Sequence, residues 1–390
     1  TKPTGTQRNY SVEQAISDRA QLHTIAFNGL AFFTGDLCSD TFIPPGKVSD
    51  FFGFQYMRDI DTGALGHNTN FLPTIANNML FVLNNAQKDQ LILLAHEQVQ
   101  QIRDLALQRF SLIKAYRRLL ENDIPTGSIG LDKSSVMAYT AEMFELDGLL
   151  AYRRAEVLGN ILRSLTEQQK ADLHKLKFGK STTWPQKRDQ VYKRSMSHGA
   201  HVAVMTYASE MFSWYKGSNE ADTYFCPERH GTYFGGFYMK DRPAMGNPGY
   251  SISTSLTGNS GEMMLTILNN SQRQQIVALI DLQRNALQQI VETRRAISVQ
   301  LRHFMTTPFV DKDTLRTLAH RYGELDGELA YLYATSFAKV FKTLSGIQKE
   351  KLRKLRNLEK FTCRGAYLYS DPINMPIIPN TDFLFDLTRR

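Results

Sequence analysis

The sequence predicts an all-α protein made of two homologous helical domains. In residues 84–120, apolar side chains recur at alternating steps of four and three. This spacing is typical of one buried stripe on an α-helix. A second stretch of the same kind spans residues 269–305. The chain is therefore expected to contain the same long helix twice, once in each half.

Short sequence matches extend this repeat along the chain. YMRD at 56–59 returns as YMKD at 238–241, LNNAQ at 83–87 as LNNSQ at 268–272, ELDG at 145–148 as ELDG at 324–327, and LTEQQ at 165–169 as LSGIQ at 344–348. The matches keep the same order, and a repeat of this length is a whole domain rather than a solenoid unit. We therefore predict a tandem duplication, with domains at 1–180 and 189–358 and an extended C-terminal tail at 359–390.

The expected elements of the first half can be placed in order. Residues 10–34 have a helical pattern, with Ser11 as the predicted N-cap and Gln14 three residues later. The next segment is rich in Gly, Pro, Asp and aromatic residues, which predicts a long loop. Further helices are expected at 71–83, 84–120, 134–164 and 165–176, with a loop at 121–130. The second half is predicted to repeat this order.

The C-terminal segment 361–390 has no helical period. Pro372, Pro376 and Pro379 favour an extended backbone there. Its many apolar residues would be a liability if they were left in solvent. We expect the tail to pack along its own domain or against a neighbouring subunit.

Composition limits the class of protein. The 390 residues are 42% hydrophobic and 22% charged, as in globular proteins. No run approaches the roughly 20 apolar residues of a membrane-spanning helix. The formal charge of +8 favours acidic partners, but no block of five or six Lys or Arg residues indicates a nucleic-acid-binding arm. Thr1 as the first residue is consistent with an exported protein that has lost a signal peptide, or with a trimmed start.

Cysteine and histidine positions give little support for a metal site. Cys38, Cys226 and Cys363 allow one disulfide and one leftover thiol, with the pairing open. Cys226 and His230 lie four residues apart in CPERH, and His201 stands in HGAH. A zinc site needs three or four ligands, so a structural or solvated role is favoured for these residues. No metal and no other cofactor is expected.

Charged residues on the apolar stripes suggest internal ion pairs. Arg109 lies in register with the stripe of the first long helix, and Arg294 with that of the second. Burial of an unpaired charge is very costly. The repeat register suggests that Arg109 pairs with Glu145 and Arg294 with Glu324. The alternative is that each arginine stem lies on the core while its guanidinium reaches water.

The aromatic loops are the most distinctive feature of the sequence. Two aromatic groups match in kind between the halves and precede a basic–acidic pair in each: Phe51, Phe52, Phe54 and Tyr56, and Tyr233, Phe234, Phe237 and Tyr238. Aromatic side chains are enriched at interface hot spots, so these residues are candidates for binding clients or sister subunits. The alternative is that the loops fold back and their rings complete the core.

Four short motifs resemble the LTxxQ motif of the Spy/CpxP family of bacterial periplasmic proteins. They begin at Leu83, Leu165, Leu268 and Leu344, and only Leu165–Gln169 fits the motif strictly. In that family the Thr or Asn caps a helix and the Gln occupies its third position, which is the arrangement of a capping box. Family members are small helical proteins that form cradle-shaped dimers. The resemblance implies two such units fused in one chain, with chaperone-like or metal-responsive roles and no catalysis.

These observations together predict a non-catalytic, exported binding or scaffold protein. The sequence has no G-x-S-x-G, P-loop or H-E-x-x-H motif, so no enzymatic activity is predicted. Basic and apolar helical surfaces would hold protein partners, and an oligomer or larger assembly is expected. Two alternatives stay open. One is a structural subunit of a surface or extracellular assembly, and the other is a metal-handling envelope protein.

Overall fold

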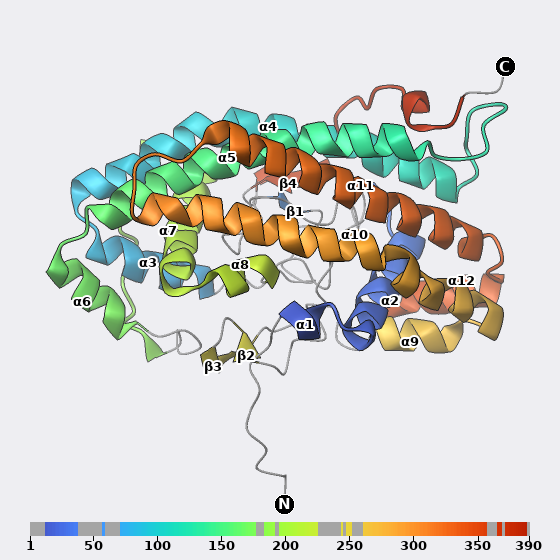
Figure 1. Ribbon diagram of the computed structural model, residues 1–390, viewed down its shortest axis with the longest axis horizontal. Coiled ribbons are helices and arrows are strands. Elements are labelled where there is room, and N and C mark those ends of the chain that lie inside the picture. The colour runs from blue at the N-terminus through green and yellow to red at the C-terminus, as the bar shows by residue number, and fades with distance from the viewer. Residues whose placement is uncertain are drawn as a thin grey trace, which may run out of the picture.

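The computed structural model describes residues 12–37, 57–58, 71–176, 183–191, 195–224, 243–244, 247–251, 260–356, 365–368 and 371–387. Its four long helices run along the long axis of the molecule (Figure 1). They are α4 (Asn85–Leu120), α5 (Lys133–Arg163), α10 (Asn270–Arg302) and α11 (Lys312–Phe341). The predicted helical class is confirmed. No described helix combines the length and the apolar composition that crossing a bilayer requires.

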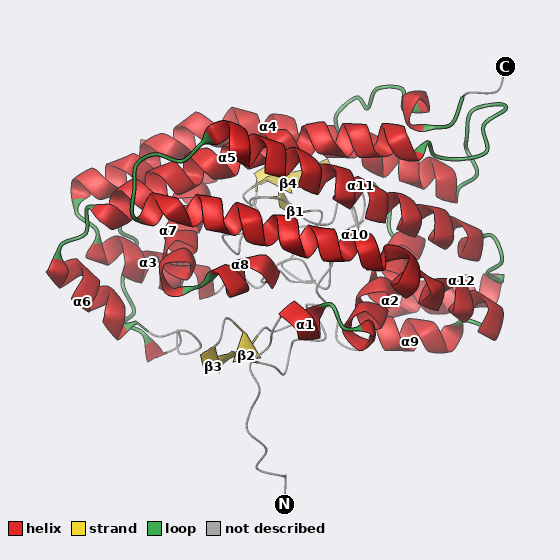
Figure 2. Cartoon of the chain, in the orientation of Figure 1, coloured by secondary structure: helices red, strands yellow, loops and turns green. Residues whose placement is uncertain are grey.

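Shorter helices and a few strands complete the described residues (Figure 2). The helices are α1 (Val12–Ala15), α2 (Asp18–Thr34), α3 (Phe71–Val82), α6 (Glu167–Lys175), α7 (His198–Lys216), α8 (Asn219–Tyr224), α9 (Ser260–Ile267) and α12 (Gly346–Arg356). The strands are β1 (Met57–Arg58), β2 (Pro243–Ala244), β3 (Asn247–Ser251), β4 (Gly365–Leu368) and β5 (Asp371–Asn374). Strands β1, β4 and β5 form one small antiparallel sheet, and β2 pairs with β3.

Most of the predicted helices are found within one or two residues of their expected ends, but the first is not. The single helix expected over 10–34 is interrupted between α1 and α2. Ser17 adopts an extended backbone there, and its side chain accepts a hydrogen bond from the Ala20 amide at 3.3 Å. A serine in this position ends one helix and caps the next, because its hydroxyl satisfies a free amide of the first turn.

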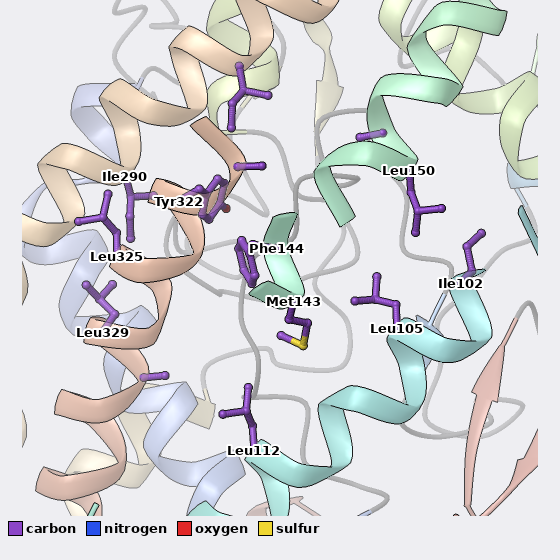
Figure 3. Close-up of a cluster of buried hydrophobic side chains, with 14 of the residues drawn as sticks. Ile102, Leu105, Leu112, Met143, Phe144, Leu150, Ile290, Tyr322, Leu325 and Leu329 are labelled. Carbon is purple, nitrogen blue, oxygen red and sulfur yellow. The ribbon is translucent and has the colours of Figure 1, made fainter. Parts of the chain in front are cut away.

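The centre of the molecule is the contact between α5 and α11. Figure 3 shows Phe144 of α5 and Tyr322 of α11 facing one another, and their ring centroids lie 4.9 Å apart. The two backbones approach closely beside Gly323, where an added Cβ atom would lie 2.6 Å from the Ala141 Cα atom. The buried apolar residues form one continuous core that includes both halves of the sequence.

The first helix of each half packs against the other half. Helix α2 lies against α9, α10 and α12, and helix α7 lies against α3 and α4. The two halves therefore do not bury their apolar residues separately. The physical reason is that most of α2 is buried, including the whole run from Thr24 to Phe33. A helix that is apolar on nearly every side needs neighbours on every side. The proposed boundaries at 180 and 189 stay a prediction about the sequence repeat.

The described residues of the C-terminal tail, 365–368 and 371–387, form a hairpin and then an irregular segment that packs on the first half of the chain. After the β4–β5 hairpin, the backbone oxygen of Leu384 accepts a hydrogen bond from the Asp132 amide at 2.9 Å. Asp382 forms an ion pair with Arg118 of α4 at 2.8 Å. Leu384 and Phe385 are buried. Burial of these two side chains offsets the cost of ordering the segment.

Candidate functional site

The aromatic residues singled out above lie outside the described residues. This holds for Phe51, Phe52, Phe54, Tyr56, Tyr233, Phe234, Phe237 and Tyr238, and also for Cys38, Cys226, His230 and Cys363. Their predicted roles stay predictions. Within the described residues, no group of three or more His, Cys, Asp or Glu side chains is placed to hold a metal ion. His201 is buried on α7, and its Nε2 lies 2.8 Å from Asp189 Oδ2.

The two predicted ion pairs are not formed, and each glutamate instead lies beside basic side chains of α11. Glu145 lies 3.5 Å from Arg316 and 3.2 Å from His320 of α11. Glu324 lies 4.0 Å from His320 and 3.7 Å from Arg321. Both carboxylates are partly exposed where α5 meets α11, whereas Arg109 and Arg294 are buried. The two arginines therefore lie in the core, whereas the two glutamates lie at the partly exposed surface.

In each ELDG motif, the carboxylate that is buried is that of the aspartate, not that of the glutamate. Asp147 and Asp326 are almost fully buried, as are Arg109 and Arg294. The helical period could have revealed this, because a residue two positions after a surface glutamate points toward the opposite side. Burial raises the pKa of Tyr116 and Tyr333, and the charge of Asp326 raises both pKa values further.

Arg294 shows how the second half accommodates such a buried charge. Its guanidinium donates to the backbone oxygens of Thr223 at 2.6 Å and Asp222 at 3.0 Å, and to the Tyr322 hydroxyl at 2.8 Å. These acceptors come from the end of α8 and from α11. Carbonyl oxygens at a helix C-terminus carry partial negative charge, so they stabilise a guanidinium. The buried arginine thus holds α8 against the long helices.

A buried ion pair between the two halves occupies positions that are uncharged in their repeat equivalents. Arg154 of α5 forms an ion pair with Glu210 of α7 at 3.1 Å, and both side chains are fully buried. The Arg154 guanidinium also stacks over the Tyr207 ring at 5.0 Å from its centroid. Alignment of the ELDG motifs places Tyr333 at the position of Arg154, and alignment of the N-caps Ser17 and Ser197 places Leu30 at the position of Glu210. Both residues are also buried. This ion pair therefore distinguishes the two halves at otherwise comparable helix junctions.

The LTxxQ-like motifs form capping boxes that are joined in pairs. In the first half, Gln87 and Gln169 close the boxes at the starts of α4 and α6. The Gln169 side chain then donates to Gln87 Oε1 at 2.8 Å and to the Val82 backbone oxygen at 2.9 Å. The Gln87 side chain donates to the Ser164 hydroxyl at 3.0 Å. The two glutamines therefore join the starts of α4 and α6 to the ends of α3 and α5.

The second half holds the same arrangement. Gln272 and Gln348 close the capping boxes of α10 and α12. The Gln348 side chain donates to Gln272 Oε1 at 2.8 Å and to the Ile267 backbone oxygen at 3.1 Å. The Gln272 side chain donates to the Thr343 hydroxyl at 3.1 Å. Each partner stands at the position that the repeat register assigns to its equivalent in the first half.

A surface groove of about 310 Å³ lies between α4, α5 and the segment that follows α10. Gln90, Leu93 and Leu94 line it from α4, Arg153, Glu156, Val157, Asn160 and Arg163 from α5, and Pro308 from the connecting segment. Leu94 and Val157 are buried, whereas 67% of Leu93 is exposed. This volume is at the lower end for small-molecule pockets, and it has room for a few side chains.

The rim of the groove is held by polar contacts. Arg153 donates two hydrogen bonds to Glu97, at 2.9 and 3.1 Å, and one to Glu156 at 2.8 Å. The hydrogen bonds with Glu97 and Glu156 raise the pKa of Arg153. Arg163 donates to the backbone oxygens of Phe304 and Thr307, which holds the connecting segment against α5. An apolar floor with a polar rim is the usual anatomy of a protein-binding surface.

No protein-family model matches the chain, and no curated protein or solved structure matches it.

Proposed function

We propose that this chain is a non-catalytic, exported protein-binding protein made of two linked copies of a Spy/CpxP-like helical unit. The observation that carries the proposal is the pair of joined capping boxes in each half, Gln87 with Gln169 and Gln272 with Gln348. The capping boxes are built from the four motifs that resemble LTxxQ. Their geometry also supports the tandem duplication, because four equivalent residues in each half make the same hydrogen bonds.

The exchange of α2 and α7 supports an intramolecular pair. Each of these helices packs on the opposite half, as subunits of a dimer do when they exchange an element. Each exchanged helix also stays tied to its own half near its C-terminal end. Arg117 of α4 donates to the Phe32 and Gly35 backbone oxygens at the end of α2, at 2.6 and 3.0 Å. Arg302 of α10 donates to the Trp214 backbone oxygen of α7 at 3.1 Å. A linked pair of units would not need a partner chain to complete its core.

The groove beside Leu93 is the proposed binding surface. Leu93 is strongly exposed, and so is Phe309, which follows the groove residue Pro308 in the sequence. Apolar side chains of a partly unfolded client would pack on Leu93, Leu94 and Val157, with the Glu97–Arg153–Glu156 cluster at the rim. Binding energy at such surfaces comes mainly from a few desolvated anchors. The proposal therefore predicts that one substitution at the centre of the groove reduces client binding.

The test measures suppression of client aggregation by the intact chain at near-stoichiometric ratio. Leu93→Ser is expected to reduce suppression about five-fold or more, the range of a lost hot-spot contact. Ile129→Ser is the matched control, because 84% of Ile129 is exposed in a loop outside the groove. Both variants change a solvent-exposed side chain, so folding is preserved. The proposal is rejected if the wild-type protein does not suppress aggregation or if both variants lose suppression equally.

A structural subunit of a larger assembly is the second candidate. The tail supports it, because Ile377 is 99% exposed and Phe383 is half exposed, although the neighbouring Leu384 is buried. Sister chains would cover these two side chains in an assembly. Native mass spectrometry separates the candidates. A monomer that suppresses aggregation supports the first, and a large assembly that dissociates with Ile377→Asp supports the second.

A further inference from the structure

Helices α6 and α12 occupy equivalent places in the two halves. Each starts at a capping box, with Thr166 and Ser345 as the N-caps, and each contributes one member of a glutamine pair. Each also buries one leucine in the core, Leu173 in α6 and Leu352 in α12. The structural demands on the two helices are therefore alike. Differences between their outward faces need another explanation.

The outward face of α6 is electrically balanced. Lys170 forms an ion pair with Glu167 at 2.9 Å, and Lys175 forms one with Asp172 at 2.9 Å. These residues are the only lysines and carboxylates of its sequence, EQQKADLHK. A face of this kind attracts neither anions nor cations strongly.

The outward face of α12 is strongly basic. Its sequence, GIQKEKLRKLR, contains five Lys or Arg residues and one carboxylate, Glu350. Arg353 and Lys354 both lie 3.8 Å from this single carboxylate, and both are well exposed. Lys351 stands where α6 has Asp172, so the charge at that position is reversed between the halves. Lys351, Arg353 and Lys354 are solvent-exposed and are not needed for the glutamine pair.

An exposed apolar side chain lies within this basic face. Ile347 is 72% exposed, and the equivalent position of α6 holds Gln168. Lys351 and Lys354 follow at steps of four and seven, so they share the side of the helix that carries Ile347. A flexible polyanion would be held by charge alone. An isoleucine among lysines instead matches an anionic bilayer, where the cations meet headgroups and the apolar side chain enters the interface.

We propose that the outward face of α12 that carries Ile347, Lys351 and Lys354 docks the protein on an anionic phospholipid bilayer. The helix lies at one end of the elongated molecule, beside α9, where a flat surface can reach it (Figure 1). The contact is peripheral, with the helix lying on the surface. It does not depend on client binding, because the groove beside Leu93 lies on α4 and α5.

The test measures co-sedimentation of the full chain with vesicles at about 0.1 M salt, at which exposed charges still act over about 10 Å. Vesicles of phosphatidylglycerol and phosphatidylcholine are compared with vesicles of phosphatidylcholine alone. The protein is expected to bind only the anionic vesicles. Each lysine near such a surface contributes about five-fold, so K351Q/K354Q should weaken binding about 25-fold.

Helix α6 supplies the matched control. K170Q/K175Q removes the same number of lysines from the equivalent helix and is expected to change vesicle binding less than about two-fold, because those lysines lie in balanced pairs. Ile347→Gln places the α6 residue in α12 and should weaken binding several-fold while the salt dependence is retained. Circular dichroism of each variant checks that the helices remain folded.

Two results would overturn the proposal. The first is equal binding to neutral and anionic vesicles, or no binding to either. The second is equal weakening by the α6 and α12 double variants, which would show a general effect of net charge. Polyglutamate and RNA are tested in parallel. Binding of either of these through Lys351 and Lys354, without binding to anionic vesicles, would assign the face to an acidic protein or a nucleic acid.

Discussion

The side-chain amide of Gln169 donates to Gln87 Oε1 at 2.8 Å, while both glutamines close the capping boxes of their own helices. One side chain thus satisfies a free backbone amide at its own helix start and also joins that start to another helix. Gln348 and Gln272 repeat the relationship in the second half. The starts of α4 and α6, and those of α10 and α12, are therefore held together by polar contacts at the surface of an apolar core.

The glutamine pairs should make equal contributions to stability. Gln87→Ala and Gln272→Ala each remove a capping box and the bond to the paired glutamine, and both side chains are buried. Each variant is expected to lower the free energy of unfolding by about 2 kcal/mol. Urea unfolding measures the loss. Gln168→Ala, on the exposed face of α6, serves as the control and should be nearly neutral. A neutral result for both buried glutamines would contradict the structure.

The α5–α11 contact should not accept a side chain at Gly323. A Cβ atom there would lie 2.6 Å from both the Ala141 Cα atom and the Thr140 backbone oxygen, and backbone atoms cannot swing aside. Gly323→Ala is therefore expected to destabilise the protein by about 3 kcal/mol, although alanine favours helix formation. Gly346→Ala is the control, since no atom lies within 4 Å of the position that its Cβ atom would take. Thermal unfolding of the two variants should differ clearly.

The buried pair of Arg154 and Glu210 should be strongly coupled. Glu210→Leu or Arg154→Tyr alone leaves one charge buried without its partner, and each is expected to cost about 3–5 kcal/mol. The double variant introduces the residues found at the corresponding positions of the other half, Tyr333 and Leu30. A double-mutant cycle should show that it costs at least about 1 kcal/mol less than the sum of the single changes. Strict additivity would mean that the ion pair contributes nothing beyond its separate side chains.

The protein should lose stability in mild acid because of His23 on α2. Burial lowers the pKa of His23 from its usual value of 6.5. The carboxylate of Glu262, 3.2 Å away, opposes this lowering, and the charge of Arg19 adds to it. The unfolded chain therefore protonates this ring at a higher pH than the folded chain does. Stability from the neutral ring is present above pH 6.5 and is lost as the pH falls through 6.5 toward the folded pKa.

His23→Gln removes this titration, so the variant should lose less stability than the wild type between about pH 7.5 and about pH 5.5. Urea midpoints at the two pH values measure the difference. His320→Gln provides a comparison, because His320 is half exposed between Glu145 and Glu324. An unchanged pH dependence in His23→Gln would show that the ring is not buried as a neutral group.

Local pattern predicted the helices well because it acts over a few residues. The apolar period located α4 and α10. An Asn or Thr followed three residues later by Gln located the capping boxes of α4, α6 and α10. The same reasoning missed the break at Ser17, where the helical pattern continues through a residue that can also serve as an N-cap. The ion pairs failed for a related reason. Repeat register gives the order of residues along a helix, but it did not show that both arginines are buried while both glutamates are partly exposed.

The sequence by itself determined the helical class, the order and bounds of most helices, and the capping chemistry at the starts of the long ones. Only the tertiary structure decided that α2 and α7 cross to the opposite halves and that Asp147 and Asp326 rather than the neighbouring glutamates are buried. It also decided that residues 384–385 of the tail pair with Leu131 and Asp132. The reason is that period and capping are set by residues within one or two turns. The choice between chemically similar apolar surfaces depends on side-chain shapes from segments far apart in the chain.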